Sequence, residues 1–144
     1  MTATFAPDGA PSSAPTRPEP PEEKIEETFE PVCPLHDLPI ERGVAALVGG
    51  EQVALFRTHD DAVFAVQQLD PYCGAHVISR GIVGTRGAVP TVASPMYKQV
   101  FDLRSGECLD PVGREPLALR TWPVLVRAGV VHVGRTRVAR AQAA

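Results

Sequence analysis

The chain has 144 residues, which is enough for one domain of ordinary size and leaves no room for a second. Residues 1–30 carry seven acidic and two basic side chains (net −5), and residues 31–144 carry ten acidic and twelve basic ones (net +2), so the body lacks the concentrated positive charge that nucleic-acid binding requires. No stretch approaches the roughly 20 apolar residues of a membrane helix. Residues 1–30 also lack the basic start and apolar run of a secretory signal, so we expect a soluble, cytoplasmic protein whose three cysteines are reduced thiols.

Proline and acidic residues dominate the N-terminal segment. Six prolines lie between residues 7 and 21 among Ala, Ser, Thr and Glu, a composition that buries too little apolar surface to offset its ordering entropy. We predict that residues 1–26 are a disordered, solvating tail and that residues 27–135 form the folded domain. Residues 136–144 lack an apolar face and are predicted to fray as a C-terminal tail.

The first half of the domain reads as short strands separated by turns. Apolar and β-branched runs predict strands at residues 28–33, 44–48, 52–57 and 63–69. The segment 34–43 connects the first two of these and has room for one helical turn. Gly49, Gly50 and Glu51 form a hairpin signal between the second and third strands.

Residues 70–90 break this pattern and read as a long, glycine-rich insertion, with Gly81, Gly84 and Gly87 in a flexible turn. Loops of this length inside a compact domain are usually functional. Further strands are predicted at residues 91–93, 99–103, 108–109, 117–126 and 130–133. Trp122 is the largest core candidate. Eight or nine short strands without an amphipathic helix indicate an all-β sandwich or small barrel.

Two cysteine–histidine pairs have a spacing at which both side chains can reach one zinc ion: Cys33 with His36, and Cys73 with His76. The first pair lies at a strand exit and the second in a glycine-containing loop, whereas structural zinc sites usually present their ligands on tight knuckles. A small buried thiol and an exposed turn histidine explain each pair more simply. A zinc-binding module therefore remains a minor alternative.

Two other segments resemble the cluster-binding loops of Rieske proteins. Residues 94–99 read Ser-Pro-Met-Tyr-Lys-Gln and precede Phe101-Asp102-x-x-x-Gly106, where the Rieske pattern is Cys-Pro-x-His followed by Phe-Asp-x-x-x-Gly. Ser94 therefore stands at the cysteine position and Tyr97 at the histidine position. Residues 70–75 resemble the first loop, Cys-x-His-x-Gly-Ala, with Asp70 at the cysteine position and Tyr72 at the histidine position.

The resemblance implies a Rieske-like antiparallel β-sandwich with two loops at one tip. A Rieske centre needs two thiolates on one iron and two imidazoles on the other. All four ligand positions have changed, and Cys73 and Cys108 do not restore the missing pair. We therefore expect this chain to bind no cluster, no other cofactor and no metal.

The sequence lacks the cluster ligands and has the run Ser-Arg-Gly-Ile-Val-Gly at residues 79–84. In both features it is similar to the small subunit of assimilatory NAD(P)H-dependent nitrite reductase. The resemblance covers residues 30–134. It implies a large partner subunit that carries FAD, siroheme and an iron–sulfur cluster and reduces nitrite to ammonia in nitrate assimilation, with this chain as its non-catalytic companion. A Rieske [2Fe-2S] electron-transfer protein is the alternative.

The four degenerate positions also suggest how the tip is closed without a cluster. We expect Tyr72 and Tyr97 to meet in the space that a cluster would fill, each burying a large ring. Asp70 and Ser94 are expected to accept hydrogen bonds from loop amides, as short polar side chains do in turns.

A second expectation concerns the surface beside these loops. Arg80, Arg86, Lys98 and Gln99 lie on or next to the loop tip in the sequence, where Rieske proteins approach their redox partners. We predict that they contact the large subunit. Ordinary solvated loop charges explain them equally well.

Overall fold

The computed structural model describes residues 28–135, and residues Phe29–Arg135 form one compact unit. The predictions for the tails at residues 1–26 and 136–144 lie outside the described residues. Within residues 28–135, no helix is long and apolar enough to cross a membrane.

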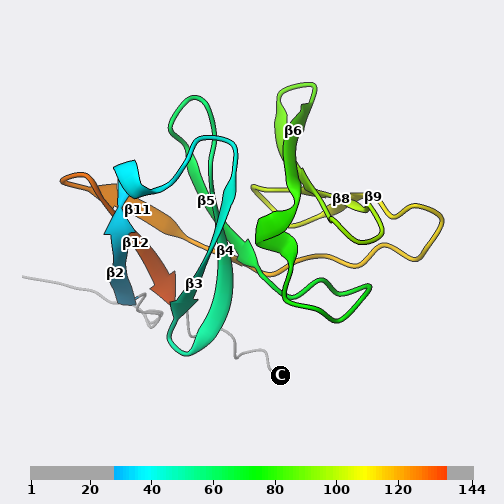
Figure 1. Ribbon diagram of the computed structural model, residues 1–144, viewed down its shortest axis with the longest axis horizontal. Helices are drawn as coiled ribbons and strands as arrows, with labels where there is room; N and C mark the ends of the chain where they lie inside the picture. The colour runs from blue at the N-terminus through cyan, green and yellow to red at the C-terminus, as the bar shows by residue number, and fades with distance from the viewer. Residues whose placement is uncertain (1–27, 136–144) are drawn as a thin grey trace, which may run out of the picture. The chain divides into compact units, whose positions relative to one another are not determined.

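The described residues form strands and two short 3-10 helices, and the element types agree with the all-β prediction (Figure 1). In chain order they are β2 (Thr28–Pro34), η4 (Leu35–Asp37), β3 (Gly43–Val48), β4 (Glu51–Arg57), β5 (Val63–Gln67), η5 (Ile78–Arg80), β6 (Ile82–Arg86), β7 (Val89–Ala93), β8 (Val100–Asp102), β9 (Cys108–Asp110), β10 (Thr121–Trp122), β11 (Val124–Arg127) and β12 (Val130–Arg135).

These strands make three antiparallel sheets, with the orders β10-β5-β4-β3, β11-β12-β2 and β6-β7-β8-β9. In Figure 1 the sheet that contains β4 lies between the other two. Short turns fix the register, since β3 and β4 pair from Val48 with Glu51 at the turn to Gly43 with Phe56 at the far end. The predicted antiparallel sandwich is confirmed.

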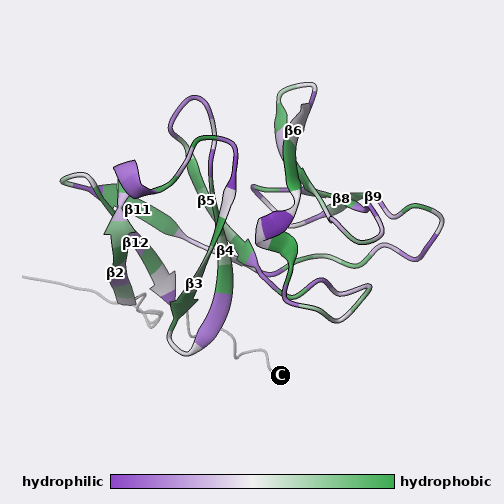
Figure 2. Cartoon of the chain, in the orientation of Figure 1, coloured by the Kyte–Doolittle hydropathy of each residue, from purple (hydrophilic) through white to green (hydrophobic). Residues whose placement is uncertain are grey.

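Strand β4 explains why the domain has two cores. Its residues 53–56 are all buried, because neighbouring sheets cover both faces of the strand. Val53 and Leu55 point into the base core, a cluster of buried residues comprising Leu38, Val48, Val53, Leu55, Ala65, Val131 and Val133. Ala54 and Phe56 point into the tip core, which comprises Ala54, Phe56, Val66, Ile78, Val92, Phe101, Leu103 and Leu119. Figure 2 shows that much of strands β3, β4, β5 and β11 is apolar, whereas the turn between β4 and β5 is polar.

The prediction of an irregular insertion at residues 70–90 is wrong for the second half of that segment. It contains η5 and strand β6, and the turn at Gly87 joins β6 to β7 as a hairpin. The segment Gly81 to Gly87 is thus mainly strand and not a flexible turn. The pattern hid this strand because β6 is an edge strand paired only with β7, and its side chains are half-buried or exposed, so it needs no apolar run.

Two further expectations need correction near the C-terminal end of the domain. Residues 117–120 are not a strand, because the Leu119 amide donates to the Gly106 carbonyl and the Arg120 carbonyl accepts from the Gln67 amide, outside any ladder. Trp122 is half-buried in the two-residue strand β10, with the Arg120 guanidinium 4.5 Å from its ring centroid. The largest fully buried side chains are Phe56 and Phe101.

Candidate functional site

The two predicted cluster-like loops lie together, and a third loop joins them. The first loop (residues 70–77) leads from β5 toward η5, the second (residues 94–99) joins β7 to β8, and the third (residues 111–120) joins β9 to β10. We call these three loops the tip. Each pair of loops is connected by a side-chain contact.

The first contact joins the two positions at which Rieske proteins carry cysteine. The Ser94 hydroxyl donates a hydrogen bond to Asp70 Oδ2, and both side chains are buried. The other carboxylate oxygen, Oδ1, accepts from the amides of Tyr72 (2.8 Å) and Cys73 (3.4 Å). Ser94 Oγ in turn accepts from the Met96 amide at 3.1 Å. The predicted bonds to loop amides are confirmed, and the direct Asp70–Ser94 bond is an addition that the sequence pattern did not predict.

The second contact runs from Tyr72 to the third loop. The Tyr72 hydroxyl donates to the Glu115 carbonyl and accepts from the Leu117 amide, both at 2.8 Å, and lies 3.5 Å from Cys108 Sγ. The Tyr72 ring packs against the tip core, with its centroid 6.3 Å from that of Phe101. Burial raises the pKa of Tyr72 most, and the hydrogen bond with the Cys108 thiol raises it further. The hydroxyl is therefore protonated at neutral pH and available as the donor.

Tyr97 makes the third contact. Its side chain is 44 % exposed, and the guanidinium of Arg114 in the third loop lies 5.1 Å from its ring centroid. The prediction that Tyr97 and Tyr72 together fill a closed space is wrong. Tyr72 packs inward against the tip core, whereas Tyr97 lies at the surface and contacts the third loop through Arg114.

The sequence pattern did not predict that the third loop belongs to the site. Its sequence, between Asp110 and Thr121, has no metal-ligand pattern and offers mostly backbone groups to the site, such as the Glu115 carbonyl. Backbone donors and acceptors leave no signature in residue type. The only available signal was composition, since Pro111, Gly113 and Pro116 mark a turn-rich connection after β9.

The donors present at the tip do not fit a [2Fe-2S] cluster. A carboxylate, a hydroxyl and two phenols replace the two thiolates and two imidazoles that such a cluster needs. Asp70 and Ser94 are moreover bonded to each other and to loop amides, so their oxygens already have partners. These loops therefore do not offer the ligand set of a [2Fe-2S] cluster.

The alternative zinc site finds no support in the placement of the residues. Across residues 28–135, no three or more His, Cys, Asp or Glu side chains come together in a way that could hold a metal ion. Burial raises the pKa of the Cys33 thiol most, and the negative charge of Asp37 raises it further. The higher pKa opposes formation of the thiolate that zinc requires.

The predicted partner-contact residues fall into different environments. Arg80 at the end of η5 and Lys98 in the second loop are exposed. Arg86 is exposed as well and lies 3.7 Å from Asp110 in an ion pair. Gln99 is 1 % exposed, which contradicts its expected place on the surface. Its carbonyl accepts from the Ser94 amide at the base of the second loop, where the chain re-enters the sheet as β8, so its side chain turns inward.

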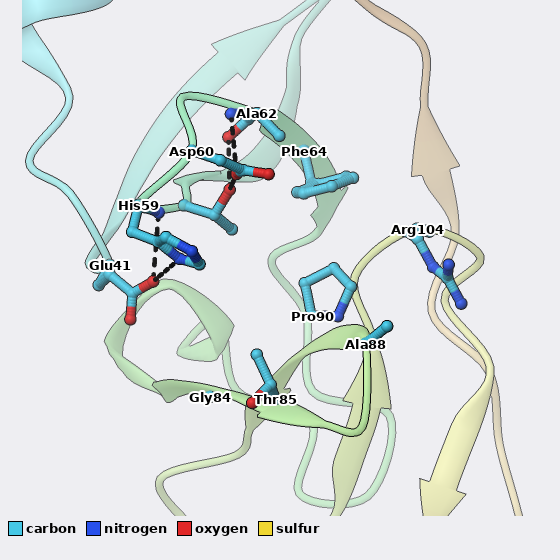
Figure 3. Close-up of a pocket in the computed structure, with 11 residues that line it drawn as sticks. Glu41, His59, Asp60, Ala62, Phe64, Gly84, Thr85, Ala88, Pro90 and Arg104 are labelled. Atoms are coloured by element: carbon cyan, nitrogen blue, oxygen red, sulfur yellow. Dashed lines mark hydrogen bonds and ion pairs between the residues drawn. The ribbon is translucent and has the colours of Figure 1, made fainter.

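A separate pocket of about 240 Å³ lies between the β4–β5 turn and the β6–β7 hairpin (Figure 3). Its polar rim includes Glu41, His59 and Asp60 on one side and Arg104 on the other, and Phe64 lines its apolar part. Glu41 is paired with His59. The Thr58 hydroxyl donates to Asp60, which lowers the pKa of that carboxyl, and Arg104 is paired with Asp102. Because these charges satisfy one another, the pocket offers no free set of donors to a ligand.

Comparison with known proteins defines the class. The family model for the Rieske-like [2Fe-2S] domain matches residues 28–134. The chain therefore belongs to the family of Rieske-like domains, as its sandwich and two tip loops indicate. Relatives that the chain matches over nearly their whole length at 35% identity or more include small subunits of nitrite reductase, and the resemblance drawn from the sequence is confirmed.

Three relatives illustrate this placement. The nitrite reductase (NADH) small subunit of Salmonella typhimurium is 39% identical over 106 residues, which cover 73% of this chain and 95% of the relative. A crystal structure from Mycobacterium tuberculosis, described as an NADH-dependent nitrite reductase small subunit, superposes with a TM-score of 0.70 at 42% identity and covers 76% of this chain and 96% of that one. The nitrite reductase [NAD(P)H] large subunit of Klebsiella oxytoca is 41% identical over 142 residues, which are 98% of this chain but 13% of that protein.

Proposed function

We propose that this chain is the accessory small subunit of an NAD(P)H-dependent nitrite reductase that reduces nitrite to ammonia in nitrate assimilation. The observation that carries the proposal is the similarity to the Salmonella small subunit over 95% of that protein's length. The proposal includes a cytoplasmic location, where NAD(P)H is available as the reductant.

In this proposal the redox cofactors belong to a large subunit, which carries FAD, siroheme and an iron–sulfur cluster. The buried Asp70–Ser94 hydrogen bond supports that division, because it joins the two loops with oxygen atoms where a cluster-bearing domain needs sulfur ligands. The Klebsiella relative supports it as well, since a protein named as the large subunit contains a segment similar to nearly all of this chain. This chain then contributes a surface and no reacting group.

The tip is the surface that we propose contacts the large subunit. Its second and third loops expose apolar side chains, which are Met96, Tyr97, Val112 and Leu117. Lys98 lies in the second loop, and Arg80 ends η5, which directly follows the first loop. An exposed apolar group rimmed by charge is typical of a protein–protein contact. The three contacts between the loops hold this surface in one arrangement before binding, which lowers the entropy cost of association.

Co-expression with the large subunit of the same host tests the function. We expect the two chains to co-purify and expect NAD(P)H oxidation that depends on nitrite to fall when this chain is omitted. The optical spectrum of this chain alone should lack the bands of an iron–sulfur cluster. Unchanged turnover without the chain, together with no co-purification, would contradict the proposal.

Charge reversal tests the surface. The double variant Arg80→Glu, Lys98→Glu should weaken co-purification with the large subunit, because both changed side chains lie at the proposed contact. Arg127→Glu is the matched control, since Arg127 is an exposed arginine on β11, in the sheet that lines the base core. Equal loss in the control would show that overall charge, and not this surface, governs the association.

A further inference from the structure

A second pocket, of about 260 Å³, lies where η5 passes the start of β3. It is lined by Arg42, Gly43, Ser79, Arg80 and Gly81. Arg42 precedes the first residue of β3 and Arg80 ends η5, so the two arginines come from separate segments and meet at one opening. The contacts that hold the tip together do not involve these two arginines, so they do not explain why both lie at the same opening.

Gly43 and Gly81 line the pocket together with the two arginines. A Cβ atom added at Gly43 would lie 2.2 Å from the Ser79 carbonyl oxygen, so the start of β3 approaches η5 as closely as glycine allows. This close approach places Arg42, which precedes Gly43, and Arg80, which follows Ser79, at the same opening.

The two arginines of this pocket differ in their ion pairing from most other arginines of residues 28–135. Five arginines in residues 28–135 have a carboxylate partner: Arg57, Arg86, Arg104, Arg120 and Arg135. Arg42 and Arg80 have none among the described residues. Glu41, the acidic neighbour of Arg42 in sequence, contacts His59 instead. The pocket beside Phe64 shows the opposite case, since its charged groups pair with one another.

We infer that the Arg42–Arg80 pocket is a binding site for a single oxyanion group, a carboxylate or a phosphate. Guanidinium groups present planar forks of N–H donors that match the two oxygens of such groups. Ser79 lines the same pocket between the two arginines in sequence, and its hydroxyl is a type of group that can donate to an oxyanion. The pocket is too small for a dinucleotide, so the anion is either a free small molecule or one acidic side chain of another protein.

Amide chemical-shift titration of the full chain by NMR tests this inference. The probes are inorganic phosphate, as a free anion, and N-acetylglutamate N-methylamide, as a model of an acidic side chain, with ionic strength held constant by sodium chloride. Because the site is open to solvent, we expect saturable shifts at residues 79–81 with a dissociation constant on the order of 1 to 10 mM. Tighter binding of phosphate would identify a free anion, and tighter binding of the glutamate model would identify a protein side chain.

Variants locate the site. Arg42→Gln combined with Arg80→Gln should weaken binding at least tenfold, and each single change should weaken it less. Arg127→Gln, which removes one positive charge from an exposed position on β11 and so matches each single change, should leave the titration unchanged. The inference is overturned if neither probe gives saturable shifts, if chloride alone reproduces them, or if the Arg127 variant weakens binding as much as the double variant. The readout needs no partner subunit, so its failure is separate from failure of the proposed function.

Discussion

The base core and the tip are stabilised by different interactions. Seven buried apolar side chains from β3, β4, β5, β12 and the segment after η4 fill the base core, and no cofactor is needed to hold them. At the tip, three loops of irregular backbone meet above the tip core, and their contacts are a buried hydrogen bond, a bridging tyrosine hydroxyl and a cation–π pair. Apolar burial is non-directional, whereas each polar contact depends on one particular partner.

This difference shows how residues other than cluster ligands can join the loops of a Rieske-like fold. A cluster connects two loops through covalent bonds to sulfur and nitrogen, and here Asp70 and Ser94 make that connection with one buried hydrogen bond. The two remaining former ligand positions, Tyr72 and Tyr97, both reach the third loop. The tip is thus joined by three separate contacts, whereas a cluster would join two loops at a single centre.

The largest effect is expected in the base core. Leu55→Ala removes a side chain with 0% exposure between two sheets, and we expect the free energy of unfolding to fall by about 2 to 5 kcal/mol. Urea denaturation followed by circular dichroism measures it. Leu47→Ala on the adjoining strand β3 is the matched control, because Leu47 is 67% exposed, and it should cost less than about 0.5 kcal/mol. Similar losses in the two variants would mean that the base core is not the main source of stability.

The next effect concerns the bond between the first and second loops. Asp70→Ala leaves the Ser94 hydroxyl and the amides of Tyr72 and Cys73 without their buried acceptor, so we expect a loss of about 1 to 3 kcal/mol. Ser94→Ala should cost less, because Asp70 keeps its amide donors. A double-mutant cycle over the two positions, again by urea denaturation, should give a clear coupling energy. Additive losses would contradict a direct bond between the two side chains.

The base core and most strands could be predicted from the sequence because their pattern is periodic. Alternation identified the strands around Val53 and Leu55, and Gly49 with Gly50 marked the hairpin between β3 and β4. Strand β6 could not be found in this way. It lies at a sheet edge and carries Gly84, Thr85 and Arg86, so hydrogen bonds to β7 define it and apolar burial does not.

The tip could be predicted only in part. The Rieske-like spacing identified Asp70, Tyr72, Ser94 and Tyr97, and the structure brings their two loops together. Which partner each side chain takes depends on the third loop, which contributes backbone groups and Arg114. The exposure of Gln99 was predicted wrongly because a polar residue at the start of a predicted strand, next to Lys98, was expected at the surface, whereas its side chain is buried at the entrance to β8.

A smaller effect is expected for the hydroxyl that joins the first and third loops. Tyr72→Phe keeps the ring on the tip core and removes the hydrogen bonds to Glu115 and Leu117, so we expect a loss of about 1 kcal/mol. Hydrogen exchange of the Leu117 amide should become faster in this variant. Unchanged exchange would show that the hydroxyl does not hold the third loop.

The same hydroxyl gives a pH dependence with a definite sign. Burial and the Cys108 contact raise the pKa of Tyr72 in the folded protein above its value of about 10 in the unfolded chain, so folding favours the protonated form. Its stabilisation is complete below the unfolded pKa and is lost as the pH rises through the folded pKa. Stability measured across the alkaline range should therefore fall more steeply in the native chain than in Tyr72→Phe. Parallel curves would assign the alkaline loss to other groups.

The smallest effect is expected at Tyr97, the half-exposed former ligand position. Tyr97→Ala removes only the exposed contact with Arg114, so we expect the free energy of unfolding to fall by about 0.5 kcal/mol, less than for Tyr72→Phe. Arg114→Ala should give a similar change, and the double variant should add nothing further if the two side chains act as one pair. If Tyr97→Ala instead cost as much as Asp70→Ala, Tyr97 would be a buried support of the tip. A small loss leaves the side chain free to serve the contact with the large subunit, which co-purification of the same variant would measure.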